Sequence, residues 1–223
     1  EAAQSVLLYA AKTKHLAIVY NKQFVVPSAL WSERANIDNK TGIHAFCDSS
    51  WTSPKSTYGF VVFMGGGPIC YCSRLSKVIT DSVAYAEYSA VSVCTKDLSF
   101  IRNLCNEIGH VLQGPIVLGV DNNASISIAD NVGVSKLTKH FDLAVHRIRD
   151  EVEMLRCKLK HVPTKDQTAD IFTKALDPTT FVYHRDRLLQ QLRPSPMLTK
   201  EANCLGRSSA CNAFDGPGKG KTV

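Results

Sequence analysis

The stretch Val83-Ala84-Tyr85-Ala86-Glu87-Tyr88-Ser89-Ala90 begins the helical pattern around which the rest of the chain is organised. The pattern continues at steps of three and four residues through Val83, Glu87, Ala90, Cys94, Leu98, Ile101, Cys105 and Ile108. Seven of these eight positions are apolar, which predicts a long helix lying against a core. Glu87 is the exception, because a carboxylate is rarely buried unless a cation or a hydrogen-bond donor meets it. The alternative is a glutamate at the edge of the stripe that reaches solvent.

The bulk composition is that of an ordinary globular protein. The 223 residues are 44% hydrophobic and 21% charged, which suits one large domain or one domain with appendages. A net charge of +6 is compatible with a nucleic-acid partner, although many unrelated proteins are as basic. Eight cysteines without C-x-x-C pairs or finger-like spacing predict reduced, buried thiols in an intracellular protein, cytosolic or nuclear.

The ends of the chain differ in character from its middle. We expect no membrane partner, because no apolar run approaches the length of a membrane span and there is no signal peptide. The first residue is Glu1, which suggests a piece of a longer protein. Residues 1–40, with a helix near 2–14 and an extended segment at 16–20, are predicted to be a connector that ends in a polar boundary at 34–42. Residues 41–178 are the predicted domain, residues 179–193 a helical extension, and residues 194–223 a disordered tail.

The middle of the chain predicts a mixed α/β fold. Strands are expected at 43–47, 58–64 and 69–73, and the three glycines at 65–67 favour a hairpin between the last two. The long helix follows, capped by Asp81 or Ser82, and then come a buried strand at 115–120, helices near 123–130 and 141–153, and an amphipathic strand at 155–160. A last helix is expected from about Asp166. The order predicts a five-stranded mixed sheet, three strands antiparallel and two parallel, with helices on both faces.

Four acids fall where such a sheet would bring them together. Asp48 and Asp121 each end a hydrophobic strand, Glu87 lies early in the long helix, and Asp170 lies in the last helix. Ligands of open α/β sheets bind at the carboxyl ends of parallel strands. Gathered carboxylates repel one another unless cations intervene, and Mg²⁺ prefers oxygen ligands. Each acid alone is better explained as a cap or a surface charge, but the set favours a metal site.

The chain resembles a known family in several short motifs. They are Asp48-Ser-Ser-Trp51, Ser56-Thr-Tyr-Gly59, Gly65-Gly-Gly-Pro-Ile69, Ala86-Glu-Tyr88, Asp121-Asn122, Thr138-Lys-His-Phe-Asp142 and Val162-Pro-Thr-Lys-Asp-Gln-Thr-Ala-Asp-Ile-Phe-Thr-Lys174. In this order they resemble the ribonuclease H domain of copia-type LTR retrotransposon polyproteins, from about residue 2 to residue 176. The N-terminal piece resembles the tail of the preceding reverse transcriptase.

The resemblance implies a ribonuclease H-like fold and the hydrolysis of the RNA strand in RNA–DNA hybrids during reverse transcription. It implies two Mg²⁺ ions, replaceable by Mn²⁺, that are held by Asp48, Glu87, Asp121 and Asp170. By analogy Asp48 bridges both ions, Glu87 and Asp121 hold the ion on the leaving-group side, and Asp170 holds the ion that activates water. The implied partners are the hybrid and the reverse transcriptase domain of the same polyprotein. The implied location is a cytoplasmic virus-like particle or the nucleus.

Three departures from the family pattern put activity in question. Ser50 replaces the second acid of the usual Asp-Ala-Asp-Trp, and the residues before Glu87 lack an acid at Ala84 or Tyr85. Cellular ribonucleases H carry a histidine shortly before the last acid, and residues 164–169 contain none. His161 is a substitute or simply a strand residue. Asp166 lies one turn before Asp170, and the Ala-Asp-x-x-Thr-Lys pattern selects Asp170.

Basic residues are candidates for holding the phosphates of a duplex. They are Arg74, Lys77, Lys136, Lys139 and His140, with Arg147 and Arg149 close by in the sequence. Lys and Arg bind phosphates without reading base sequence. The alternative for each is a solvated basic surface.

Two other functions remain open. One is a catalytically decayed or co-opted module that only binds nucleic acid or serves as a structural part of the polyprotein. The other is a strand-transfer enzyme of the same fold, which usually needs three acids in a different arrangement.

Overall fold

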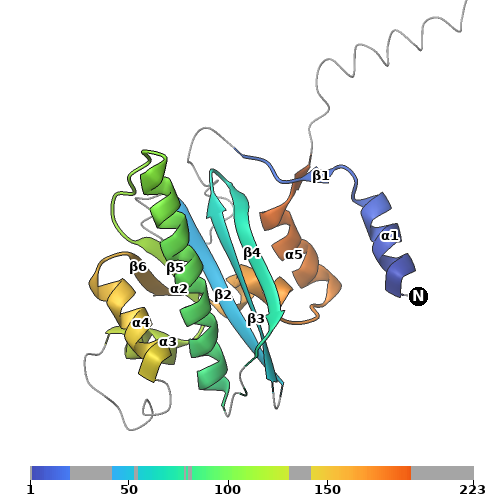
Figure 1. The fold of residues 1–223 in the computed structure, drawn as a ribbon. Coiled ribbons are helices and arrows are strands. Elements are labelled where there is room, and N and C mark those ends of the chain that lie inside the picture. The colour runs from blue at the N-terminus through green and yellow to red at the C-terminus, as the bar shows by residue number, and fades with distance from the viewer. Residues whose placement is uncertain are drawn as a thin grey trace, which may run out of the picture. The chain divides into compact units, whose positions relative to one another are not determined.

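The computed structural model describes residues 2–20, 42–52, 55–77, 79, 82–130 and 142–191 (Figure 1). The chain divides into two compact units, residues 1–17 with 191–223 and residues 18–190. In the first unit lie α1 (Ala2–Lys12), which has no buried residue, and β1 (Leu16–Ala17), so the helix predicted near residues 2–14 is confirmed. The tail predicted from residue 194 lies outside the described residues, as does the boundary predicted at 34–42 except for its last residue.

The second unit is built on a five-stranded mixed sheet. Its strands, in the order β4-β3-β2-β5-β6, are β2 (Ile43–Thr52), β3 (Lys55–Met64), β4 (Gly67–Leu75), β5 (Ile116–Val120) and β6 (Cys157–His161). β2 pairs with β3 and β3 with β4 in antiparallel fashion, whereas β2 pairs with β5 and β5 with β6 in parallel. The predicted division into three antiparallel and two parallel strands is confirmed.

The predicted glycine hairpin joins β3 to β4. Gly65 and Gly66 have φ angles of 61° and 82°, which glycine adopts without a steric penalty. Two consecutive residues with positive φ form the turn whose twist matches that of paired strands. The local sequence therefore determined this connection.

The long helix α2 (Val83–Glu107) covers one face of the sheet. Ser82 is its N-cap, and the Ser82 side chain accepts a hydrogen bond from the amide of Tyr85. The predicted stripe is buried at Glu87, Ala90, Cys94, Leu98, Ile101 and Cys105. Its end residues Val83 and Ile108 are exposed, because they lie beyond the part of the helix that the core covers.

Two hydrophobic clusters lie on opposite faces of the sheet, since successive strand residues point to opposite sides. Ala45 and Cys47 pack with α2, whereas Phe46 between them packs with Val162, Ala169 and other residues. The remaining elements are α3 (Asn123–Asp130), α4 (Asp142–Glu153), α5 (Pro178–Leu188) and β7 (Gln190–Gln191). Helices cover both faces of the sheet, as predicted. Among the helices that the structure describes, none has the length and apolar character needed to cross a bilayer.

The helix predicted from Asp166 is wrong. The structure has two 3-10 turns there, η4 (Thr164–Asp166) and η5 (Thr168–Phe172), separated by extended backbone at Gln167. The buried Gln167 side chain donates to the carbonyl oxygens of Cys47 at 3.0 Å and Gly119 at 3.4 Å. These carbonyls lie where the ladder between β2 and β5 ends, so they need donors from elsewhere. A continuous helix would not place this amide between the two strands.

Candidate metal centre

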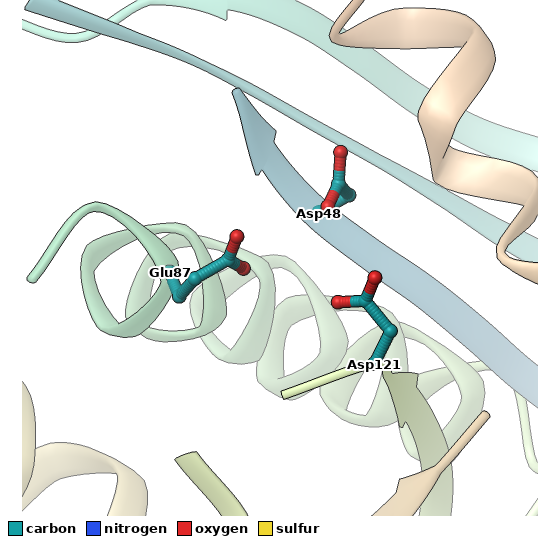
Figure 2. A group of neighbouring side chains, drawn as sticks. All are labelled: Asp48, Glu87 and Asp121. Atoms are coloured by element: carbon teal, nitrogen blue, oxygen red, sulfur yellow. The ribbon is translucent and has the colours of Figure 1, made fainter. Parts of the chain in front are cut away.

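Three of the four predicted acids converge just beyond the paired part of the parallel strands β2 and β5. Asp48 of β2, Glu87 of α2 and Asp121, directly after β5, each present a carboxylate oxygen, and these atoms all lie within 4.8 Å of one another. Figure 2 shows the three side chains pointing toward one another from three separate elements. We call this group the three-acid cluster.

The position of Asp48 differs from the prediction. Asp48 does not end a strand, because β2 continues to Thr52 and pairs with β3 along its whole length. The parallel ladder with β5 extends only to Phe46, so the backbones of β2 and β5 are no longer paired at Asp48. The end of this ladder, rather than the end of β2, is what brings Asp48 and Asp121 together.

Burial and the repulsion between neighbouring acids disfavour the charged forms of Glu87 and Asp121. Asp48 is 2% exposed and Glu87 is 9% exposed. Burial, together with the charges of Asp48 and Asp121, raises the pKa of Glu87 to about 8. Burial and Asp48 also raise the pKa of Asp121, against the effect of a hydrogen bond that the Thr164 hydroxyl donates to it at 3.2 Å. A bound cation would offset the repulsion between these carboxylates, and a hard divalent ion prefers oxygen ligands of this kind.

The fourth acid, Asp170 on η5, lies next to Asp48 but outside the group of three. Lys174 Nζ lies 2.9 Å from Asp170 Oδ2 and 3.9 Å from Asp48 Oδ2. The Thr173 hydroxyl also donates to Asp48 Oδ2. Burial and the charge of Asp48 raise the pKa of Asp170 to about 6, although Lys174 opposes this shift. Lys174 therefore bridges the three-acid cluster and Asp170.

Asp166 has a different environment from Asp170. Its Oδ1 accepts a hydrogen bond from the Tyr183 hydroxyl at 2.9 Å, and its backbone carbonyl accepts one from Arg187 at 2.7 Å. Both partners belong to α5, so Asp166 anchors that helix. The choice of Asp170 over Asp166, made from the sequence, stays a prediction.

The structure describes two of the five predicted phosphate-binding residues. Arg74 and Lys77 are exposed at the end of β4 and just after it, whereas Lys136, Lys139 and His140 lie outside the described residues. Arg74 is paired with Tyr58, and Tyr58 with Ser49, the neighbour of Asp48. Because neighbouring strands lie about 4.8 Å apart, the Arg74 backbone lies on the order of 10 Å from β2 at the level of the cluster.

A groove of about 650 Å³ lies between α2 and α4. Its lining includes the cations Lys96, Arg147 and Arg156 and the anions Asp150 and Glu151. The charges are mixed, so this groove by itself does not favour a polyanion.

Comparison with known proteins relates the chain to retrotransposon polyproteins. The Pol polyprotein of transposon RE1 from Arabidopsis thaliana is 33% identical over 147 residues, which cover 64% of this chain and 10% of the relative. That of transposon TNT 1-94 from Nicotiana tabacum is 29% identical over 127 residues, which cover 57% and 10%. The Ty1-LR3 Gag-Pol polyprotein of Saccharomyces cerevisiae is 26% identical over 158 residues, which cover 68% and 9%.

The chain is similar to one region of retrotransposon Pol polyproteins from plants and yeast. It spans about a tenth of the length of these relatives. No protein-family model matches it.

Solved ribonuclease H structures are also similar to the chain. The match to RNase H1 from Halobacterium salinarum covers 59% of this chain and 93% of the RNase H1 chain, at 18% identity and a TM-score of 0.41. LC11-RNase H1, solved in complex with an RNA/DNA hybrid, has the same coverage at 14% identity and a TM-score of 0.44. The mixed sheet, with its central β2 between an antiparallel and a parallel neighbour, has the strand directions that the sequence predicted.

Three residues that contact the elements around Asp48 and Asp170 had no role assigned to them from the sequence. Gln167, Thr173 and Lys174 all stand in the motif 162–174, but only the structure shows their contacts. The spacing of Lys174 four residues after Asp170 was a usable signal, because such pairs can meet when the chain turns. Nothing local distinguishes Gln167 from a surface glutamine.

The buried acids predict how stability depends on pH in the absence of metal. The pKa of Glu87 is about 8 in the folded chain, against an ordinary value of 4.5. Between these values the folded state holds a proton that the unfolded state has released, so the free energy of unfolding should fall as pH rises. We expect a loss of roughly 1–3 kcal/mol from about pH 5 to about pH 8. Urea unfolding in the presence of a chelator measures it, and Glu87→Gln should flatten the slope. A wild-type slope that is flat or rising would contradict the prediction.

Proposed function

We propose that this Pol region hydrolyses the RNA strand of RNA–DNA hybrids with two bound Mg²⁺ ions, during reverse transcription of the element. The observation that carries the proposal is the convergence of Asp48, Glu87 and Asp121 to within 4.8 Å, with Asp170 beside them. The similarity to retrotransposon Pol polyproteins supports the same reaction.

The donor set suits magnesium. All four groups are carboxylates, and Asp170 Oδ1 is a buried oxygen without a hydrogen-bond partner among the described residues. Mg²⁺ binds oxygen ligands and retains several waters, and Mn²⁺ accepts the same ligands. A buried carboxylate oxygen that lacks a donor is costly unless a cation meets it.

The roles of the acids follow from their positions and from the family resemblance. Asp48 would contact both ions, because it lies between the rest of the three-acid cluster and Asp170. Glu87 and Asp121 would hold the ion beside the leaving oxygen, and Asp170 the ion beside the attacking water. Two bound ions stabilise both oxygens of the displacement and lower the pKa of the water. The water oxygen would form a new bond to phosphorus as the P–O3′ bond breaks, and the 3′-oxygen would take a proton from solvent, which leaves a 3′-hydroxyl and a 5′-phosphate.

Substrate contacts would come from exposed cations near the cluster. Arg74 and Lys77 lie at the same end of the sheet as Asp48, two strands away, which suits contacts to phosphates on one side of a duplex. We include Lys136, Lys139 and His140 in this proposal on sequence grounds. We also propose the reverse transcriptase domain of the same polyprotein as partner, acting in a virus-like particle or the nucleus.

A labelled RNA–DNA hybrid tests the activity directly. With Mg²⁺ we expect the wild-type chain to cut the RNA strand only, whereas Asp121→Asn should produce no fragments. Duplexes of RNA alone or DNA alone, and a reaction with a chelator, are the controls. Equal cutting by wild type and variant would show a contaminating nuclease and overturn the assignment.

A binding module without turnover is the second candidate. It is favoured by Ser50, which replaces the second acid of the family motif on β2, and by the absence of an acid at Ala84 and Tyr85. It predicts salt-dependent hybrid binding, by filter assay, without cleavage in either Mg²⁺ or Mn²⁺.

A further inference from the structure

We propose that Lys174 is a displaceable counter-cation that occupies the place of the second metal ion until that ion binds. This inference rests on the proposed two-ion function and assigns a positioning role to a residue outside the acid set. It predicts that the two ions bind with unequal affinity and that Lys174 causes the inequality.

The position of the ammonium group is the first observation. Lys174 Nζ lies 2.9 Å from Asp170 Oδ2 and 3.9 Å from Asp48 Oδ2, so a single positive charge neutralises one oxygen of each acid. An ion coordinated by the same two acids would sit about 2.0–2.1 Å from its oxygens. The ammonium and a metal ion cannot both be there, because they would overlap and repel each other.

The second observation is the unused oxygen of Asp170. Asp170 is 4% exposed, yet its Oδ1 accepts no hydrogen bond from the described residues. Lys174 contacts only the Oδ2 atom of Asp170, and the Thr173 hydroxyl donates a hydrogen bond to the Asp48 carboxylate. A buried acceptor left in this way is unfavourable, so the pair is an incomplete site rather than a finished salt bridge.

The third observation is that the Lys174 side chain has access to solvent. It is 38% exposed, whereas the Asp48 and Asp170 side chains are 3% and 5% exposed. The backbone amide of Lys174 is held by a hydrogen bond to the Asp170 carbonyl at 3.2 Å. The flexible stem can therefore swing its ammonium into water while the backbone and both acids stay in place.

A binding order follows from these contacts. No salt bridge joins Lys174 to Glu87 or Asp121 among the described residues, so the first ion can bind the three-acid cluster with the ammonium still on Asp170. The second ion must displace it. Lys174 thereby keeps Asp170 oriented in the metal-free protein and weakens the second site.

Mn²⁺ binding without substrate tests the proposal, by titration calorimetry and by the electron paramagnetic resonance of free Mn²⁺. Wild type should bind two ions, the second more weakly. Lys174→Met should bind the second ion about tenfold more tightly or better, since the repelling charge is gone. Lys174→Met should also melt at a lower temperature than wild type in chelator, and Mn²⁺ should remove the difference. Lys174→Arg keeps the charge and should retain the weak second site.

Lys158→Met, on the exposed side of β6, is the matched control and should follow wild type in every measurement. An unchanged isotherm for Lys174→Met overturns the inference and leaves the proposed function intact. Loss of an ion in Lys174→Met also overturns it, because the lysine would then build the site instead of competing for it. A wild type that binds no Mn²⁺ overturns the proposed function and this inference together.

Discussion

Asp48→Asn is expected to lower the rate of hybrid cleavage at least about a thousandfold. Asp48 belongs to the three-acid cluster and is also next to Lys174 and Asp170, so its charge serves both proposed ion positions. A correctly placed metal ion stabilises the transition state by several kcal/mol, and about 4 kcal/mol corresponds to a thousandfold in rate. Single-turnover cleavage of a labelled hybrid at saturating Mg²⁺ measures the effect.

The same substitution should not harm folding. An asparagine oxygen can still accept the hydrogen bond from Thr173, and the loss of one buried charge relieves repulsion on Glu87 and Asp121. In chelator, Asp48→Asn should therefore be at least as stable as wild type toward urea. Glu107→Gln, at the exposed end of α2, is the matched control and should keep full activity. Wild-type rates in Asp48→Asn would rule out the two-ion assignment.

Gly59→Ala is expected to lower activity about a hundredfold, although Gly59 carries no functional group. Gly59 is the ladder partner of Asp48, and η5 packs directly on it. A β-carbon there would lie 2.6 Å from Phe172 Cβ, 2.9 Å from Thr173 Cγ2 and 3.2 Å from the Phe172 carbonyl carbon. The end of η5 must move away, and with it Asp170, Thr173 and Lys174. A displacement of about 1 Å can cost on the order of a hundredfold in rate.

Overpacking at this position should also destabilise the fold by about 1–3 kcal/mol. Rates are therefore compared at a temperature where urea or thermal unfolding shows the variant fully folded. Thr57→Ala, two residues earlier on β3, removes atoms instead of adding them and is the control. Full activity in a folded Gly59→Ala would show that the position of η5 does not matter for the chemistry.

The Ser56-Thr-Tyr-Gly59 motif contains a glycine whose role is seen only in the structure. In the sequence it only marks a resemblance. Among the glycines that the structure describes, Gly59 and Gly119 are places where a side chain would collide with the segment after β6. A β-carbon at Gly119 would lie 2.7 Å from Val162 Cγ2. Glycine on β3 and β5 thus lets this segment approach the sheet and carry Asp170 to Asp48.

The sequence by itself determined the architecture and predicted the four acids. Apolar runs and one alternating segment at 155–160 predicted the strands. An apolar stripe at steps of three and four residues predicted α2 and its inward face, because periodicity records which side of an element is covered. Turn chemistry at Gly65 and Gly66 and the Ser82 cap were equally local. The order of elements then limited the sheet to few topologies.

Only the tertiary structure decided the arrangement of charges. The sequence left open whether Glu87 reaches solvent, placed Asp48 at a strand end and expected a helix around Asp170. Each depends on a contact between distant segments: the cluster with Asp121, the end of the β2–β5 ladder, and the Gln167 amide that bridges Cys47 and Gly119. Electrostatic interactions depend on distances of a few ångströms between side chains, and local periodicity carries no record of those distances.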